Sequence, residues 1–247
     1  MKTYKTAEVA KIIGIHPNTV RLYEELGLTS KPKRQANGYR VFTDFHIEQF
    51  KLARIALQIE ILQNGLRKKI IETVKTSANG DFDKALQIAE EYLLQVRHER
   101  DNAEEAIEIV MQLLTGELSK DSMSLKRKEV SEYLKISMDT LRNWEMNGLL
   151  SVKRKENGYR IYGNDDIRRL KIIRSLRCAN YSLEAILRML SELSANPQIN
   201  IKQVLNTPKD NEDIISVCDN LISSLKACES NAKIIIDRLQ YMKSKFK

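Results

Sequence analysis

Two short stretches of this chain concentrate positive charge in the way that binding to a polyphosphate requires. The first stretch contains no acid, and Glu156 is the only acid of the second. Their basic residues are Lys31, Lys33, Arg34 and Arg40 in the first, and Lys153, Arg154, Lys155 and Arg160 in the second. Lysine and arginine neutralise the phosphates of duplex DNA and release counterions, which gives affinity without sequence choice. A solvated charged hairpin is the alternative, but finding the same pattern twice favours DNA.

These basic stretches lie within a longer sequence motif that also occurs twice in the chain. Residues 19–28 recur as residues 140–149, and residues 37–42 recur as 157–162, so the offset changes from 121 (140 − 19) to 120 (157 − 37). A repeat this long predicts two domains of one type rather than a solenoid.

The start of residues 17–27, and of its repeat, is the candidate reader of the DNA major groove. The residues expected there are Pro17, Asn18, Thr19 and Arg21 in the first copy, and Met138, Asp139, Thr140 and Arg142 in the second. Arginine can contact guanine with two hydrogen bonds, but it can equally contact phosphate. Tyr23 and Trp144 lie one turn further on, where core packing and a contact to the DNA backbone are both open.

Helical segments must position these residues. Residues 6–13 predict a helix with Val9, Ile12 and Ile13 inward, Thr6 as N-cap and a stop at Gly14. A second helix opens at Pro17 and ends at Gly27, which completes a helix-turn-helix. In the second copy, residues 129–135 form the first helix with Val130, Tyr133 and Leu134 inward, Ser137 caps the second helix, and Gly148 ends it.

A β-wing is expected after each helix-turn-helix. Asn37-Gly38 and Asn157-Gly158 are strong hairpin signals, because a tight primed turn needs positive φ at both central residues. Another helix follows each wing, capped by Thr43 or Asp44 in the first copy and by Asn164 or Asp165 in the second.

Each copy is followed by a long helix with a coiled-coil pattern of apolar residues. The seam of the first is Leu86, Ala89, Leu93, Val96, Arg100, Ala103, Ile107, Val110 and Leu114, in which Arg100 is the one break. The seam of the second is Ile214, Cys218, Leu221, Leu225, Cys228, Ala232, Ile235, Leu239, Met242 and Phe246. Each seam either docks on its own domain, or the two helices pair antiparallel with each other as an intramolecular pseudo-dimer; dimerisation of whole chains is a further alternative.

Composition excludes several classes of protein. The 247 residues carry a net charge of +8 and are 42% hydrophobic, and no apolar stretch is long enough to span a membrane. Three cysteines favour a reducing cytosol. Cys218 and Cys228 are ten residues apart and cannot chelate a metal from one helix face, whereas Cys178 could be an exposed thiol. We expect no metal, cofactor or catalytic residue, because the chain contains no phosphate loop or nucleophile elbow.

Together, these motifs resemble the DNA-binding module of the MerR family of bacterial transcription regulators. The shared pattern is a Thr-x-Arg-x-aromatic-Glu helix, a Gly-Leu stop and an Asn-Gly-Tyr-Arg wing, and it covers roughly residues 3–70 and 124–193. The resemblance implies that the protein bends and untwists promoter DNA so that RNA polymerase can engage, and that family dimers form by antiparallel pairing of long helices. Leu22, Asn143 and Asp139 depart from the family pattern, which suggests that the halves read different DNA.

We therefore expect a mainly α protein with small β-wings, in the bacterial cytoplasm and associated with the nucleoid. The expected parts are a first winged helix-turn-helix domain at 1–75, a long helix at 80–115, a linker at 116–124, a second winged domain at 125–195 and a second long helix at 210–247. The partners are double-stranded promoter DNA and, indirectly, RNA polymerase, with a monomeric pseudo-dimer preferred over a homodimer and no membrane. The alternative is a regulator whose second module contacts a protein.

The full set of expected DNA-binding residues combines the helix, wing and family positions. It comprises Pro17, Asn18, Thr19, Arg21, Tyr23, Lys33, Arg34, Asn37, Gly38, Tyr39, Arg40, Thr140, Arg142, Trp144, Arg154, Lys155, Asn157, Gly158, Tyr159 and Arg160.

Overall fold

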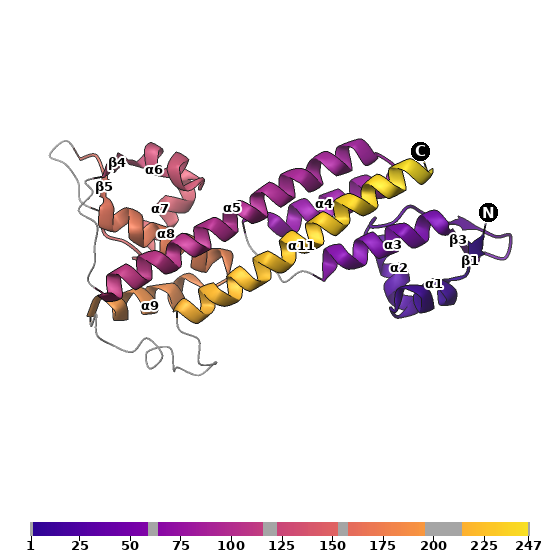
Figure 1. Ribbon diagram of the computed structural model, residues 1–247, viewed down its shortest axis with the longest axis horizontal. Coiled ribbons are helices and arrows are strands. Elements are labelled where there is room, and N and C mark those ends of the chain that lie inside the picture. Colours follow the sequence, from indigo (N-terminus) through magenta and orange to yellow (C-terminus); the bar gives the residue numbers. More distant parts are fainter. Residues whose placement is uncertain (1, 59–63, 116–122, 153–157, 196–213, 247) are drawn as a thin grey trace. The chain divides into compact units, whose positions relative to one another are not determined.

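A computed structural model describes residues 2–58, 64–115, 123–152, 158–195 and 214–246 (Figure 1). The chain divides into two compact units. Unit 1 combines Met1–Arg97 with Ser224–Lys247, and unit 2 is His98–Ser223. Both boundaries therefore fall inside long helices, α5 (Phe82–Thr115) and α11 (Ile214–Phe246). The protein is mainly α-helical with small antiparallel sheets. No helix within the described ranges is long and apolar enough to cross a bilayer.

Unit 1 begins with a winged helix-turn-helix. Its elements are β1 (Thr3–Tyr4), α1 (Thr6–Ile13), α2 (Pro17–Glu25), β2 (Lys33–Arg34), β3 (Arg40–Thr43), α3 (Asp44–Leu57), α4 (Leu66–Ala78), the first half of α5 (Phe82–Thr115) and the end of α11. The strands form an antiparallel sheet in the order β1-β3-β2, with Tyr4 opposite Phe42 and Arg34 opposite Arg40. The wing predicted from the sequence is present, and β1 is a strand that the sequence analysis missed.

Unit 2 repeats this plan. Its elements are the second half of α5, β4 (Ser124–Lys126), α6 (Arg127–Leu134), α7 (Met138–Met146), β5 (Ile161–Gly163), α8 (Asn164–Cys178), α9 (Leu183–Ala195) and the start of α11 (Ile214–Phe246). Strand β4 pairs antiparallel with β5, as β1 does with β3 in unit 1. Each unit thus presents two short helices, a strand pair and a longer helix in the same order.

The N-cap residues of the helices agree with the predictions at some helix starts and differ at others. Ser137 caps α7 as predicted, its hydroxyl accepting the amide N–H of Thr140 at 3.0 Å. Helix α1, by contrast, is capped at Lys5 rather than Thr6, because the Glu8 carboxylate accepts the Lys5 amide N–H at 2.7 Å. Thr43 caps α3 as one of the two predicted choices.

The N-cap residue of α8 lies one position before the two predicted N-cap residues. Gly163 is its N-cap residue, and the Asp166 carboxylate accepts the Gly163 amide N–H at 2.9 Å. A carboxylate three residues into the helix therefore replaces the expected Asn164 or Asp165 cap.

On each of the helices α1 and α6, one residue that was predicted to face inward is exposed. Val9 and Ile13 are buried, as are Val130 and Leu134, but Ile12 and Tyr133 are each 48% exposed. Ile12 and Tyr133 are equivalent positions of the two copies (133 − 12 = 121), so the same error occurs twice. Ala10 occupies the buried face of α1 in place of Ile12.

The first wing turns differently from the predicted primed turn. Only Gly38 has a positive φ (82°), and Asn37 does not. The Gln35 carbonyl accepts the Gly38 amide at 2.8 Å, and the Tyr39 carbonyl accepts the Gln35 amide at 2.9 Å. These bonds close a three-residue loop in which glycine supplies the left-handed residue, and such loops are the next most common hairpins after two-residue turns.

The predicted seam of the last helix is correct from Leu221 to Met242, where every predicted residue is buried; Phe246 is half-buried. Ile214 and Cys218 lie outside the described side chains. In α5 the face is rotated: Tyr92 and Glu99 are buried, whereas Leu93 and Arg100 are only half-buried. The charged residue that interrupts the buried apolar face of α5 is therefore Glu99, and not Arg100 as predicted. Val110 and Leu114 lie outside the described side chains.

Within unit 1 the two long helices run antiparallel. Asp83 of α5 pairs with Lys243 of α11, and Arg97 pairs with Glu229 at 3.1 Å between Nε and Oε1. The partner numbers fall in α11 as they rise in α5. Arg238 of α11 also binds Glu48 of α3 at 2.9 Å, so the C-terminal part of α11 packs on the first module.

Candidate nucleic-acid interface

Helix α2 presents a polar first turn to solvent. Asn18 and Arg21 are exposed, and the Arg21 guanidinium donates to the Asn18 side-chain oxygen at 2.9 Å. Pro17 and Thr19 are half-buried on the same turn. The hydrogen bond holds the arginine across the start of the helix, where a major-groove reader needs it.

Helix α7 presents the same arginine position with a different neighbour. Arg142 and Asp139 are exposed, while the Thr140 hydroxyl lies 2.9 Å from the Ser137 hydroxyl. Asp139 stands where the first copy has Asn18, so a negative charge replaces an amide at the start of this helix.

Capping side chains use some amides that were expected to face phosphate. The Asn18 amide donates to Nδ1 of His16 at 3.2 Å, and the Thr140 amide donates to Ser137. Side-chain cations are therefore the main groups with which each helix start can meet an anion.

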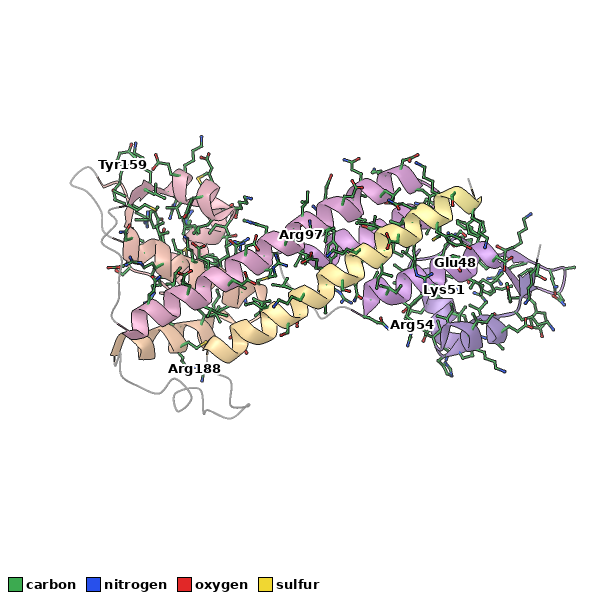
Figure 2. All side chains as sticks on the ribbon, in the orientation of Figure 1. Glu48, Lys51, Arg54, Arg97, Tyr159 and Arg188 are labelled. Atoms are coloured by element: carbon green, nitrogen blue, oxygen red, sulfur yellow. The ribbon has the colours of Figure 1, made fainter. Side chains whose placement is uncertain are left out.

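The first wing is exposed along its whole basic tip. Lys33, Arg34, Asn37, Gly38 and Tyr39 are all exposed, and Tyr39 is 70% exposed. In the second wing, Gly158 has a φ of 79° and Tyr159 is 68% exposed; Figure 2 shows the Tyr159 side chain at the outer edge of its module. The predicted contacts Arg154, Lys155 and Asn157 lie outside the described residues.

One ion pair joins wing to helix in both copies. Nε of Arg40 lies 2.5 Å from Oε2 of Glu24, and Nε of Arg160 lies 2.8 Å from Oε2 of Glu145. Both glutamates are largely buried, with side chains 11% and 9% exposed. The pair fixes the base of each wing against the helix that would enter the major groove.

Sequence reasoning missed Glu24 and Glu145 as parts of the site, although both belong to the repeated phrase. The signal was available: a glutamate recurs in the helix and an arginine recurs in the wing of each copy. Arg40 and Arg160 were expected only as DNA contacts, and the structure adds this positioning contact.

In unit 2 the Arg160–Glu145 pair is part of a larger network of contacts to Glu145. Arg127 also binds Glu145 at 2.8 Å, and the Tyr162 hydroxyl donates to the same carboxylate. Burial, followed by this hydrogen bond, raises the pKa of Tyr162 to about 12. Phe42 occupies the Tyr162 position of unit 1 (162 − 42 = 120), so the first copy lacks this hydroxyl.

The rings of Tyr23 and Trp144 are buried, which supports the core-packing interpretation of both. Tyr23 stacks on Phe50 with ring centroids 6.1 Å apart, and burial raises the pKa of its hydroxyl. Trp144 is part of the apolar cluster of unit 2. A contact of either residue to DNA stays a prediction.

Metal-binding groups are not brought together within the described part of the chain, which contains no cluster of three His, Cys, Asp or Glu side chains. Cys178 is buried, so the expectation of an exposed thiol was wrong. Cys228 is buried on the α11 seam, as its small apolar role predicts.

Unit 2 contains a hollow of about 320 Å³ between α5, α6 and α8. Glu105 and Glu108 line one side, and Arg168 and Lys171 line another. The charges are largely satisfied within the unit, since Lys171 binds Glu105 at 2.6 Å and Arg168 binds Asp165 at 3.1 Å.

The fold and this geometry define the class: a protein with two winged helix-turn-helix modules. Two family descriptions match the chain, "MerR family regulatory protein" at residues 5–42 and "MerR HTH family regulatory protein" at residues 125–193. The chain therefore carries two modules of the MerR family.

Several curated relatives match part of the chain. The HTH-type transcriptional regulator CueR of Escherichia coli O157:H7 is 43% identical over 53 residues, which is 22% of this chain and 39% of the relative. ZntR of Escherichia coli K12 is 36% identical over 64 residues, 26% of this chain and 45% of the relative. This chain thus spans less than half the length of these relatives. No solved structure gives a significant match.

Proposed function

We propose that the protein is a transcriptional regulator that binds double-stranded promoter DNA through both winged modules and has no enzymatic role. The observation that carries the proposal is the repeated glutamate–arginine pair. In each copy it fixes a basic wing beside a helix whose first turn exposes an arginine. One helix for the groove and one wing for the adjacent backbone is the geometry by which such modules dock.

We further propose that the two units form an intramolecular pseudo-dimer. The division of the chain supports it, since α5 begins in unit 1 and ends in unit 2, while α11 begins in unit 2 and ends in unit 1. Each long helix thus follows one module, and its second half belongs to the unit of the other module. Family dimers are expected to pair long helices in this antiparallel way, and the contacts within unit 1 are antiparallel.

Regulation would follow from distortion of the promoter between the two modules. Two readers joined in one chain can impose a bend or an untwisting on the DNA that connects their sites, at a cost that depends on its sequence. RNA polymerase would then respond to the shape of the promoter, without a direct contact to this protein.

Salt and arginine variants test the DNA-binding proposal. The double variant Arg21→Ala/Arg142→Ala removes two exposed cations that bind no carboxylate in the described structure, so the fold should survive. On an operator found by genome-wide mapping, we expect a loss of about 1–3 kcal/mol per arginine and, where an arginine contacts phosphate, a salt slope lower by about one.

Lys226→Ala is the matched control, because Lys226 is an exposed cation of α11 outside both modules. Its binding curve should overlay that of the unaltered protein. Equal operator affinity in the folded arginine double variant would refute DNA binding through these helices.

One observation favours a second candidate function for module 2 alone. Met138 and Met146 of α7 are 52% and 76% exposed, beside the acidic Asp139. Exposed methionines suit an adaptable protein-binding surface better than a phosphate surface. If α7 contacts a protein, Arg142→Ala will leave operator affinity unchanged while Arg21→Ala lowers it.

A further inference from the structure

The buried positions of the two long helices repeat at a fixed interval. Tyr92, Val96, Glu99, Ala103 and Ala106 of α5 correspond to Leu221, Leu225, Cys228, Ala232 and Ile235 of α11, each 129 residues later (221 − 92 = 129). The helices following the wings, α3 and α8, correspond at an interval of 120 (174 − 54 = 120). Residues of α5 and α11, and of α3 and α8, can therefore be compared position by position.

Unit 2 places a buried ion pair between its long helix and its module. Two guanidinium nitrogens of Arg174 donate to the two carboxylate oxygens of Glu99, at 2.7 and 2.8 Å. The side chains are 7% and 3% exposed, so neither charge has access to bulk water. Lys171 and Glu105 add a second pair between the same two helices.

Unit 1 uses different residues at the equivalent positions. Cys228 stands where α5 has Glu99, and the module residue equivalent to Arg174 is Arg54, which is only half-buried. Because Arg54 can reach water, the long helix packed on the first module needs no carboxylate at this position. Figure 2 shows Glu48, Lys51 and Arg54 along α3, the helix on which the end of α11 packs.

At a second pair of equivalent positions, unit 2 has the opposite charge on the module and an uncharged residue on the long helix. Arg238 of α11 binds Glu48 of α3, whereas the corresponding residues in unit 2 are Ile109 and Arg168 (238 − 109 = 129; 168 − 48 = 120). Docking α11 on module 2 would thus bring Arg238 towards Arg168. It would also leave the buried Arg174 opposite Cys228 without a carboxylate, which is strongly unfavourable.

We propose that the Glu99–Arg174 and Arg238–Glu48 pairs select which long helix each module accepts. Module 2 accepts the second half of α5 and rejects the second half of α11, so the second half of one chain does not pair with the second half of another copy. The partner that fits module 2 is the first half of this chain. This inference rests on the proposed pseudo-dimer, but its test does not use DNA.

Complementary charge reversals in the full chain give the test. One chain carries Glu99→Arg and the other Arg174→Glu, so each has two like charges at the buried pair. Alone, each variant should lose amide-exchange protection in α8 and in the second half of α5. Mixed, the two chains restore both opposite-charge contacts between them, and light scattering should detect a complex of 57 kDa (2 × 28.5).

The double variant Glu99→Arg/Arg174→Glu in one chain is the control, and it should regain protection as a 28.5 kDa monomer. No complex on mixing, together with a double variant no better protected than either single, would overturn the proposal. If a reversal abolishes folding, Glu99→Gln, Arg174→Gln and their combination replace it; additive losses of protection would also overturn it. An unaltered chain that binds no promoter DNA would defeat the proposed function while leaving this pairing result intact.

Discussion

At the scale of single residues, the two modules differ most beside their equivalent arginines. Arg21 has the amide of Asn18 as its neighbour, whereas Arg142 shares its turn with the carboxylate of Asp139. The first arrangement presents only a cation and neutral groups to DNA. The second presents both signs of charge, so we expect module 2 to contribute less affinity.

Exchanging these neighbours tests that difference. Asp139→Asn should strengthen operator binding by on the order of 1 kcal/mol, because it removes an anion near the phosphates. Asn18→Asp should weaken binding by a similar amount. Titrations at several salt concentrations measure both changes, which should shrink as salt rises. The prediction requires that the two substitutions change operator affinity in opposite directions. Weaker binding by both variants would contradict it.

The tyrosine of the unit 2 network makes stability depend on alkaline pH. Its pKa of about 12 in the folded protein lies above the ordinary 10, so its contribution is complete below pH 10 and is lost between pH 10 and 12. Tyr162→Phe, which installs the residue of unit 1, should remove this part of the pH dependence. Denaturant titrations of both proteins from pH 9 to 12 measure it, and parallel curves would contradict it.

Several residue roles could be predicted from the sequence, and others could not. Exposure of Arg21 and the wing followed from polar types at turn and helix-start positions. The contacts of Glu24 did not, because Glu24 and Arg40 are 16 residues apart and only the folded hairpin brings them together. For Tyr23, sequence left burial and exposure equally open, since an aromatic ring with a hydroxyl suits either.

At the scale of elements, the first wing depends on one glycine. Gly38 has a φ of 82°, and a Cβ added there would meet no atom within 4 Å, so backbone strain is the main cost of Gly38→Ala. That cost is about 1–2 kcal/mol. We expect the variant to fold, with weaker amide protection in β2 and β3 and reduced operator affinity.

Ala36→Gly is the control within the same turn, because Ala36 is not in the left-handed region. It should affect wing protection less than Gly38→Ala. Hydrogen exchange followed by mass spectrometry measures both, and equal protection in Gly38→Ala and the unaltered protein would show that the turn tolerates the change.

The two long helices show what a heptad pattern can and cannot predict. In α11 an apolar or small residue occupies every seam position, so the buried face was identified correctly. In α5 the residues at 99 and 100 are both charged, and the pattern alone could not tell which faces inward. The answer depends on Arg174, 75 residues away, which binds Glu99. The inward position of Glu99 therefore depends on a long-range contact that a heptad pattern does not contain.

At the scale of the whole molecule, the pseudo-dimer predicts a monomer. Light scattering at micromolar concentration should give 28.5 kDa. Because the modules are unlike and one chain needs no exact twofold symmetry, its footprint should cover an imperfect inverted repeat. A mass near 57 kDa (2 × 28.5), with a perfect palindrome protected by two chains, would contradict both expectations.

Unit 1 combines two separate parts of the chain, residues 1–97 and 224–247, and this has a consequence for the effect of mutations. Its first module is completed by the last residues of the chain: Arg238 binds Glu48, and the Phe246 ring lies 5.1 Å from that of Phe45. A stop codon near residue 224 would therefore spare every residue of the second module and injure the first. In a screen for loss of function, nonsense alleles near codon 224 should group with missense alleles in the codons of the first module.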